Sequence, residues 1–434
     1  MTPEQIRVAV AVEVACGGTL DGQGGGVGRG GGTAHNPGNM NKTVENFSLR
    51  PLHGIRVLDL TVALAGPYAS LLLGGLGAEI IRVESPNGGD VARGHPPFVG
   101  ADGLNFGARK SEEVSLAVLQ RARNKMSSTH DLKSDTGRGL LLRLARECDV
   151  VLENLSEGAT KRLGIDYEQV RQANPRIIYA SIKAFGEPSP NPSLKGMDII
   201  VQALSGLMEA TGFADGPPVR CGLPITDFVA PLFAINGILS ALIYRDRTGE
   251  GQHVKVSMLD CMASLVAEEH YDVFGSAGFP LRSGNSQDRH VPFGAYPAKD
   301  GHVAIVGFSP EWMQGLLDAM GQPELANDPR FSDRGTRVQH AAQLNAIIEE
   351  WTRRHTVDEI LHELQEKRQV PAARVRTPVE MLADPHLRAS GAVVELKHPS
   401  IGKIGALGAG LPIQFSRCTA ALDEPAMELG AANE

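Results

Sequence analysis

Aromatic residues, cysteines and long apolar runs are scarce in this 434-residue sequence, and each scarcity excludes a class of protein. The 2 Trp, 6 Tyr and 13 Phe are few for an all-β sandwich, whereas the 50 glycines suit tight turns between strands and helices. The five cysteines never form a Cys-x-x-Cys pair, which argues against a disulfide framework and indicates a reducing cytoplasm. No apolar run reaches the roughly 18–20 residues of a bilayer span, so we expect no membrane-spanning segment.

Basic residues are outnumbered, because 42 Lys and Arg face 50 Asp and Glu and leave a net charge of −8. Nucleic-acid binding requires a basic surplus or a dense basic cluster, and since neither is present we expect no nucleic-acid partner. The sequence also lacks a His-Glu-x-x-His motif, an EF-hand loop and a Cys/His cluster, so it predicts no metal site. Neither a Walker A loop nor a Gly-x-Ser-x-Gly elbow occurs.

Residues 1–47 form a glycine-rich leader that we expect to be disordered and that shows no signal-peptide pattern. Within this leader, Gly26, Gly28 and Gly31 satisfy the spacing of a dinucleotide-binding loop. Such a loop requires a helix to open immediately after it, since the helix N-terminus holds the pyrophosphate. More glycine and an Asn-Pro-Gly turn follow instead, so we interpret this motif as coincidental.

From Leu52 onward, apolar strands alternate with helical patterns, which is typical of an α/β fold with a mostly parallel sheet. The first unit is a strand from Ile55 to Leu60, a helix through Leu71 to Leu73 and a strand from Ala78 to Val83. A long apolar helix is predicted from Pro231 to Arg245. We expect a large Rossmann-like domain, a smaller α+β domain and two linkers, which comprise residues 48–247 with 380–434, residues 276–369, and residues 248–275 with 370–379.

One carboxylate stands out, because Asp227 ends the turn-rich segment Gly222–Asp227 and directly precedes an apolar helix. The residues alone leave two interpretations open: a helix N-cap, or a partly buried nucleophile or base. The run Lys195–Asp198 poses a similar choice before another apolar stretch. Arg82 and Arg162 are candidates for phosphate contacts, because ligands of open α/β sheets bind at the carboxyl ends of the strands.

Many short segments in register resemble the CoA-transferases of family III, which include formyl-CoA and carnitine CoA-transferases. The opening matches best, with Pro51–Thr61, Leu64–Pro67 and Leu76–Glu84. The resemblance spans about Leu52 to Phe415 and includes Asn174–Ser181 and Arg247–Gln252. It implies the intertwined-dimer fold of that family, in which two ring-like subunits form a homodimer in the cytoplasm.

The resemblance also implies a reaction and a set of site residues. Asp227 matches the nucleophile that forms an aspartyl-CoA thioester while CoA moves from an acyl-CoA donor to a carboxylic acid. CoA is then a substrate, and no metal or permanently bound cofactor is implied. The loop Ser283–Asn285 loosely resembles the family's mobile loop. CoA contacts are implied at Leu64, Ala65, Arg82, His130, Asp131, Leu132, Lys133, Asn154, Leu155, Ser156, Arg162, Lys195, Gly196, Met197 and Asp198.

Two alternative functions remain at this stage. The α-methylacyl-CoA racemases of the same superfamily resemble Gly-His-Asp where this chain has Gly196-Met197-Asp198, and methionine cannot accept a proton. A catalytically silent CoA-binding protein is the other alternative, and the presence of Asp227 argues against it. The sequence departs from the family in a longer stretch at Gly103–Ala122 and in a shorter C-terminus, from which we expect lower stability than in relatives.

Overall fold

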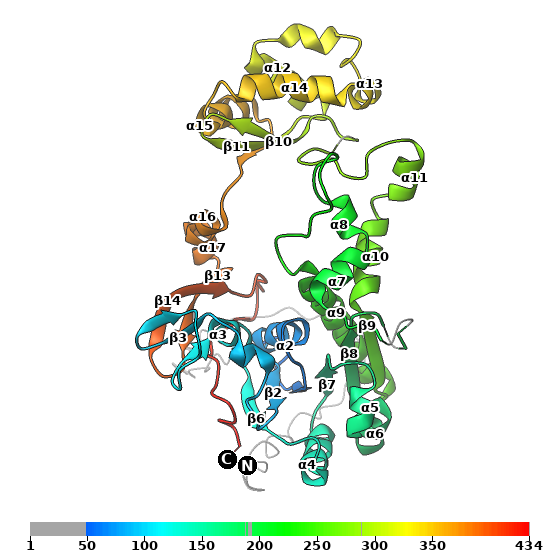
Figure 1. Ribbon diagram of the computed structural model, residues 1–434, viewed down its shortest axis with the longest axis vertical. Coiled ribbons are helices and arrows are strands. Elements are labelled where there is room, and N and C mark those ends of the chain that lie inside the picture. Colours follow the sequence, from blue (N-terminus) through cyan, green and yellow to red (C-terminus); the bar gives the residue numbers. More distant parts are fainter. Residues whose placement is uncertain (1–48, 187, 190–192, 288, 434) are drawn as a thin grey trace, which may run out of the picture.

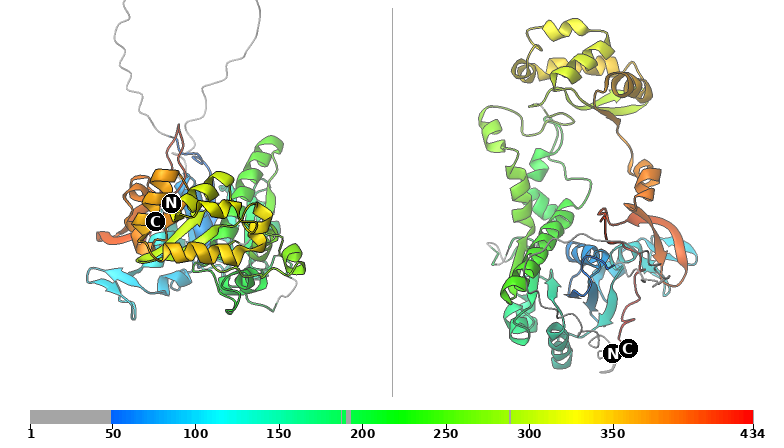
Figure 2. Two further views of the ribbon diagram at one scale, coloured as in Figure 1. Left: turned by 90° about the horizontal axis from the view of Figure 1, so that it is seen from above. Right: turned by 180° about the vertical axis from the view of Figure 1, so that it is seen from behind.

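A computed structural model of the chain describes residues 49–186, 188–189, 193–287 and 289–433 (Figure 1). The predicted glycine-rich leader and its coincidental glycine motif therefore lie outside the described residues. The described chain is mixed α/β, as predicted, with a six-stranded sheet and three small sheets. Figure 2 shows the same arrangement from above and from behind.

Every neighbouring pair of strands in the large sheet is parallel. The order across the sheet is β6-β2-β1-β7-β8-β9, so the chain winds outward from β1 in both directions. The point where the winding reverses lies between β1 and β7, and open α/β sheets bind ligands at the carboxyl ends of the strands at this point. The strands are β1 (Arg56–Asp59), β2 (Glu79–Glu84), β6 (Met126–Thr129), β7 (Val150–Glu153), β8 (Ile178–Lys183) and β9 (Gln252–Ser257).

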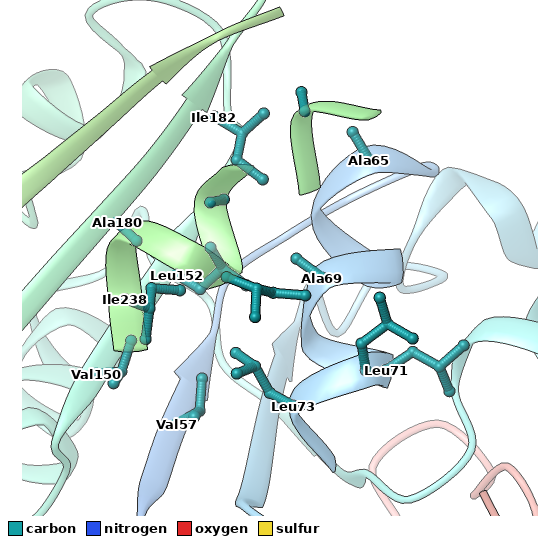
Figure 3. Close-up of a cluster of buried hydrophobic side chains, with 14 of the residues drawn as sticks. Val57, Ala65, Ala69, Leu71, Leu73, Val150, Leu152, Ala180, Ile182 and Ile238 are labelled. Atoms are coloured by element: carbon teal, nitrogen blue, oxygen red, sulfur yellow. The ribbon is translucent and has the colours of Figure 1, made fainter. Parts of the chain in front are cut away.

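Helices cover both faces of this sheet, because successive side chains of a strand point to opposite sides. Val57 packs into one core with α2 (Ala65–Gly75) and α9 (Ile225–Thr248) (Figure 3). The next residue, Leu58, packs into a separate core on the opposite face with α4 (Asp135–Arg146) and α6 (Tyr167–Ala173). Near-continuous apolar strands are what a sheet covered on both faces requires.

The long apolar helix α9 begins at Ile225, earlier than predicted, and carries Pro231 inside its second turn. By length and composition alone, α9 is long and apolar enough to cross a membrane. Polar residues interrupt its sequence, so it contains no continuous apolar run of that length. Its inner face, including Ala234 and Ile238, is buried against the sheet and α2. Leu232 and Phe233 on its outer face are 48% and 43% exposed.

A second core occupies the upper part of Figure 1. It contains a hairpin, in which β10 (Phe293–Ala298) and β11 (Gly301–Val306) pair in antiparallel register. Thr356 and Glu359, whose spacing in sequence is that of a capping box, form one at the start of α15. The surrounding elements are α12 (Pro310–Met320), η2 (Pro323–Asn327), α13 (Arg334–Gln339), α14 (Ala341–Thr352), α15 (Val357–Leu361), η3 (His362–Glu366) and β12 (Ala372–Arg374).

Regular elements occupy parts of both predicted linkers. Residues 252–257 form β9, which pairs with β8 at the edge of the large sheet, and α10 (Met258–Ala267) packs against α9. The alternating polar and apolar residues of β9 mark a half-buried edge strand that we took for a connection. At the other end, β12 pairs with β11 inside the predicted linker 370–379.

The remaining elements connect or flank the two cores. The stretch predicted to be longer than in the family folds into short strands and α3 (Leu116–Arg121), which packs with β13 (Val393–His398). The C-terminal tail returns to the large sheet, where the Ala432 amide donates to the Ser127 carbonyl at 2.8 Å. The other elements are η1 (Val91–Gly94), β3 (Phe98–Gly100), β4 (Gly103–Asn105), β5 (Val114–Ser115), α5 (Ala159–Leu163), α7 (Asp198–Leu204), α8 (Leu207–Ala210), α11 (Tyr271–Ser276), α16 (Pro378–Ala383), α17 (Pro385–Ala389) and β14 (Gly402–Ala409).

Candidate active site

Asp227 lies in the first turn of α9, as the third helical residue, and is half-buried. The N-cap interpretation is wrong, because Pro224 occupies the N-cap position and no side chain of that position caps the helix. The neighbouring Phe228 ring contacts the Tyr68 ring of α2 edge to face, with centroids 5.0 Å apart. This contact places the nucleophile candidate beside the N-terminal half of α2.

The segment before Asp227 is held by two residues of α7. The Asp198 carboxylate accepts hydrogen bonds from the Thr226 amide and the Thr226 hydroxyl, both at 2.9 Å. Gln202 is fully buried; its amide nitrogen donates to Asp198 at 2.7 Å and its amide oxygen accepts from the Cys221 backbone at 2.8 Å. Asp198 therefore satisfies the N-terminus of α9 from a neighbouring helix and leaves the Asp227 carboxylate free of that task.

The surroundings of Asp227 raise its pKa. Burial and then the nearby charge of Asp198 raise the pKa of the Asp227 carboxyl to about 6, while the charge of Arg121 opposes them. A carboxyl of this pKa is still mostly ionised at pH 7. It is also a stronger base than an ordinary aspartate, which favours attack on a carbonyl carbon.

At the switch point of the sheet, a loop runs from Thr61 to Ala65. We call it the shaped loop, because side chains from other segments fix its backbone conformation. The Asn154 side chain, which follows β7, accepts from the Val62 amide at 2.8 Å and donates to the Val62 carbonyl at 2.9 Å. Ala63 has a left-handed backbone with φ 65° and donates its amide to Asp90 at 3.0 Å. Strained backbone of this kind persists only where neighbours impose it, and it is concentrated at functional sites.

The structure corrects the expectation for Arg82. Its side chain is 2% exposed and pairs with the Asp90 carboxylate, so it has no surface to offer a phosphate. In sequence Arg82 was close to the predicted end of its strand and therefore looked accessible. The strand β2 extends to Glu84, so Arg82 lies inside it. Through Asp90, Arg82 supports the backbone of the loop at Ala63.

The predicted strip from His130 to Lys133 lines a cavity of 210 Å³ at the carboxyl ends of β1 and β2. Leu155 also lines this cavity, and its turn is fixed by a buried ion pair. Glu153 accepts from the Leu155 amide at 2.9 Å and from the Lys183 ammonium at 2.8 Å, and that ammonium also donates to the Leu155 carbonyl at 2.7 Å. The structure thus brings together predicted residues from two separate segments.

Other predicted contacts lie on the surface. Ser156, Arg162, Lys195, Gly196 and Met197 are exposed, and Met197 is 70% exposed at the N-cap of α7. Leu64 is the N-cap of α2 and Ala65 its first residue, so both belong to the end of the shaped loop. The loop at Gly284 contacts the chain that follows α8, where the Gly284 amide donates to the Gly212 carbonyl at 2.9 Å. A larger cavity, of 560 Å³, lies along the C-terminal segment and includes none of the predicted site residues.

Sequence reasoning missed three contributors to the site. Asp90 and Gln202 act by hydrogen bonds to backbone far along the chain, and Arg121 acts by its charge near Asp227. Only Gln202 carried a signal in sequence, because the stretch Gln202–Gly206 is another of the short segments that resemble the family. The partners of all three are set by the fold, so spacing could not reveal them.

Comparisons with known proteins show the family of this chain and the proteins whose fold it shares. The sequence model of the family described as CoA-transferase family III matches residues 52–433. The chain is 38% identical over 371 residues to a succinyl-CoA:mesaconate CoA-transferase of Haloarcula hispanica, covering 84% of this chain and 90% of that protein. It is 35% identical over 382 residues to a succinate–glutarate CoA-transferase of Agrobacterium fabrum, covering 88% and 93%. A CAIB/BAIF family protein from Brucella suis matches the fold with a TM-score of 0.75 at 34% identity, covering 88% of this chain and 98% of that one.

Proposed function

Since this chain belongs to CoA-transferase family III, we propose that it moves CoA from an acyl-CoA to a carboxylic acid with Asp227 as the nucleophile. The observation that supports this role is the position of Asp227 in the first turn of α9, half-buried, with a pKa raised to about 6. Dry surroundings and fixed reactants are what a weak carboxylate nucleophile needs.

The proposed steps exchange one activated acyl bond for another. An Asp227 oxygen attacks the thioester carbon of the donor, and CoA thiolate leaves to give a mixed anhydride. The thiolate then attacks the Asp227 carbonyl carbon, which releases the donor acid and leaves an aspartyl-CoA thioester. The acceptor carboxylate attacks that thioester and expels thiolate, which gives a second mixed anhydride. The thiolate then attacks the acceptor's carbonyl carbon, so that the new acyl-CoA forms and the Asp227 carboxylate leaves.

We place CoA across the switch point of the sheet. The cavity lined by His130–Lys133 and Leu155 receives part of the CoA, and the shaped loop before α2 lies between this cavity and Asp227. Arg162 and Lys195 are exposed cations available to the phosphates. Arg82 is no longer assigned to a phosphate, because it is buried against Asp90.

The acceptor is proposed to be a dicarboxylic acid. The two curated relatives described above carry succinate, mesaconate or glutarate in their names, and each of these acids has two carboxylates. We also propose that the enzyme works as a cytoplasmic homodimer. The proposed compartment rests on the scattered cysteines of the sequence, which never form a Cys-x-x-Cys pair.

A screen of acyl-CoA donors against dicarboxylic acids, read by mass spectrometry of new acyl-CoA products, tests this function. Asp227→Asn is expected to lower the rate by about 10⁴-fold or more, as for other catalytic residues. Asp215→Asn is the matched control, since Asp215 is an exposed aspartate of the preceding loop. An Asp227→Asn enzyme as active as wild type would refute the role.

The racemase alternative gains no support from the structure. Met197 occupies the position of the required base and is largely exposed at the start of α7. Deuterium exchange at Cα of a 2-methylacyl-CoA, in D₂O and without any acceptor acid, distinguishes the two reactions. We expect no such exchange; exchange without transfer would establish the alternative.

A further inference from the structure

Arg121 is a cation with unused hydrogen-bonding capacity beside the proposed nucleophile. It ends α3, which packs against η1 and α2. Its Nε is buried without a hydrogen-bond partner, and no ion pair of its guanidinium occurs among the described residues. Two neighbouring buried arginines do have ion pairs, because Arg82 pairs with Asp90 and Arg93 pairs with Glu84, although the Nε of Arg82 also lacks a hydrogen-bond partner.

The packing of α3 brings Arg121 toward two carboxylates, because α3 contacts η1, which Asp90 caps, and α2, whose Tyr68 contacts the Phe228 next to Asp227. Burial lowers the pKa of the Arg121 guanidinium, and the charges of Asp90 and Asp227 oppose this effect while the Arg82 cation adds to it. The Asp90 carboxylate already accepts from the Arg82 side chain and from the amides of Ala63 and Ala92. Arg121 is therefore near two carboxylates, one of which is occupied and the other of which is the proposed nucleophile.

A half-buried arginine without a partner is costly, because a donor removed from water gains nothing in return. A planar guanidinium matches a carboxylate with two parallel hydrogen bonds, so a second carboxylate is a suitable ligand. We infer that Arg121 binds the non-reacting carboxylate of a dicarboxylic acid while its other end reacts at Asp227. This inference rests on the proposed function and assigns Arg121 as a specificity-determining residue of the same site.

The test compares two acids that differ by one carboxylate, glutarate and pentanoate, as acceptors for wild type and Arg121→Gln. We expect Arg121→Gln to lower kcat/KM for glutarate by about 10- to 100-fold, mainly through KM, and to change pentanoate by less than about threefold. Arg121→Lys keeps the charge but loses the planar group that donates two parallel hydrogen bonds. Its kcat/KM for glutarate should therefore lie between the values of wild type and Arg121→Gln. Arg171→Gln, which removes an exposed arginine of α6, is the control and should match wild type.

Several results would overturn the inference. An equal loss for both acids would mean that Arg121 acts through Asp227 or the fold, and an effect on the KM of acyl-CoA alone would make it a CoA contact. An unchanged glutarate KM would also refute it. Should Arg121→Gln fail to fold, Arg121→Lys decides by the same comparison, with an expected loss of about three- to tenfold.

A binding measurement separates failure of this inference from failure of the proposed function. Glutarate should raise the thermal unfolding midpoint of wild-type protein and of Asp227→Asn, but not that of Arg121→Gln. If wild type transfers no CoA yet is protected by glutarate in an Arg121-dependent way, the proposed function fails and the binding role of Arg121 stands. No protection of wild type at millimolar glutarate would refute the binding role.

Discussion

At the residue scale, the site depends on a division of tasks between two aspartates. Asp198 bonds to Thr226 and so satisfies the start of α9, while its charge also raises the pKa of Asp227. The sequence singled out both residues, yet it could not show that they meet, because they lie on different helices. Nor could it decide between cap and nucleophile for Asp227, since both interpretations need a carboxylate at a helix start.

The raised pKa makes Asp227 a source of instability that depends on pH. The carboxyl titrates near 3.8 when exposed but near 6 in the folded protein, so ionisation disfavours folding as pH rises from the first value through the second. We expect Asp227→Asn to unfold like wild type below pH 3.8 and to be more stable by about 1–3 kcal/mol above pH 7. Urea unfolding at several pH values measures this difference. A variant that is less stable at pH 8 would contradict the assignment.

At the element scale, the site is built on the connection between β1 and α2. Most elements were predictable, because strands and helices follow local patterns such as the capping box at Thr356. The strand β9 was not, since its pairing with β8 is a contact between distant segments. The shape of the loop at Ala63 was equally hidden, because it depends on Asp90 and Asn154, which lie in the segments that follow β2 and β7.

Close packing at the start of α2 leads to a second prediction. A Cβ on Gly66 would lie 2.4 Å from the Thr61 side chain, so Gly66→Ala must shift the loop. We expect a loss of about 1–3 kcal/mol in the free energy of unfolding and weaker CoA binding. Gly139→Ala is the matched control, because nothing lies within 4 Å of its Cβ in α4, and it should stabilise by about 0.5–1 kcal/mol. Equal effects of both variants in chemical unfolding would count against the tight loop.

At the scale of the whole molecule, the outward winding of the sheet explains why separate segments converge. The turns after β1 and β7 face each other at the switch point, and the strip after β6 lines the adjacent cavity. Alternation of strands and helices predicted the parallel sheet but not the order of its strands. The order follows from long-range pairing, which no single segment records.

The outer face of α9 predicts association with a second copy of the chain. Leu232, Phe233, Ile243 and Tyr244 are each between 43% and 54% exposed, which is unusual for large apolar residues of one helix. Light scattering should give twice the 46.2 kDa of one chain. Ile243→Glu should shift the mass toward one chain, whereas Leu140→Glu on α4 should not. A monomeric wild type would refute the homodimer.

The central claim, a covalent intermediate on Asp227, is tested most directly by trapping it. Borohydride added during turnover with acyl-CoA reduces an aspartyl thioester to an alcohol, and peptide mass spectrometry locates the modified residue. The account predicts modification at Asp227, dependent on acyl-CoA and absent from Asp227→Asn. An active enzyme that carries no modification at Asp227, or carries it at another carboxylate such as Asp198, would contradict the account.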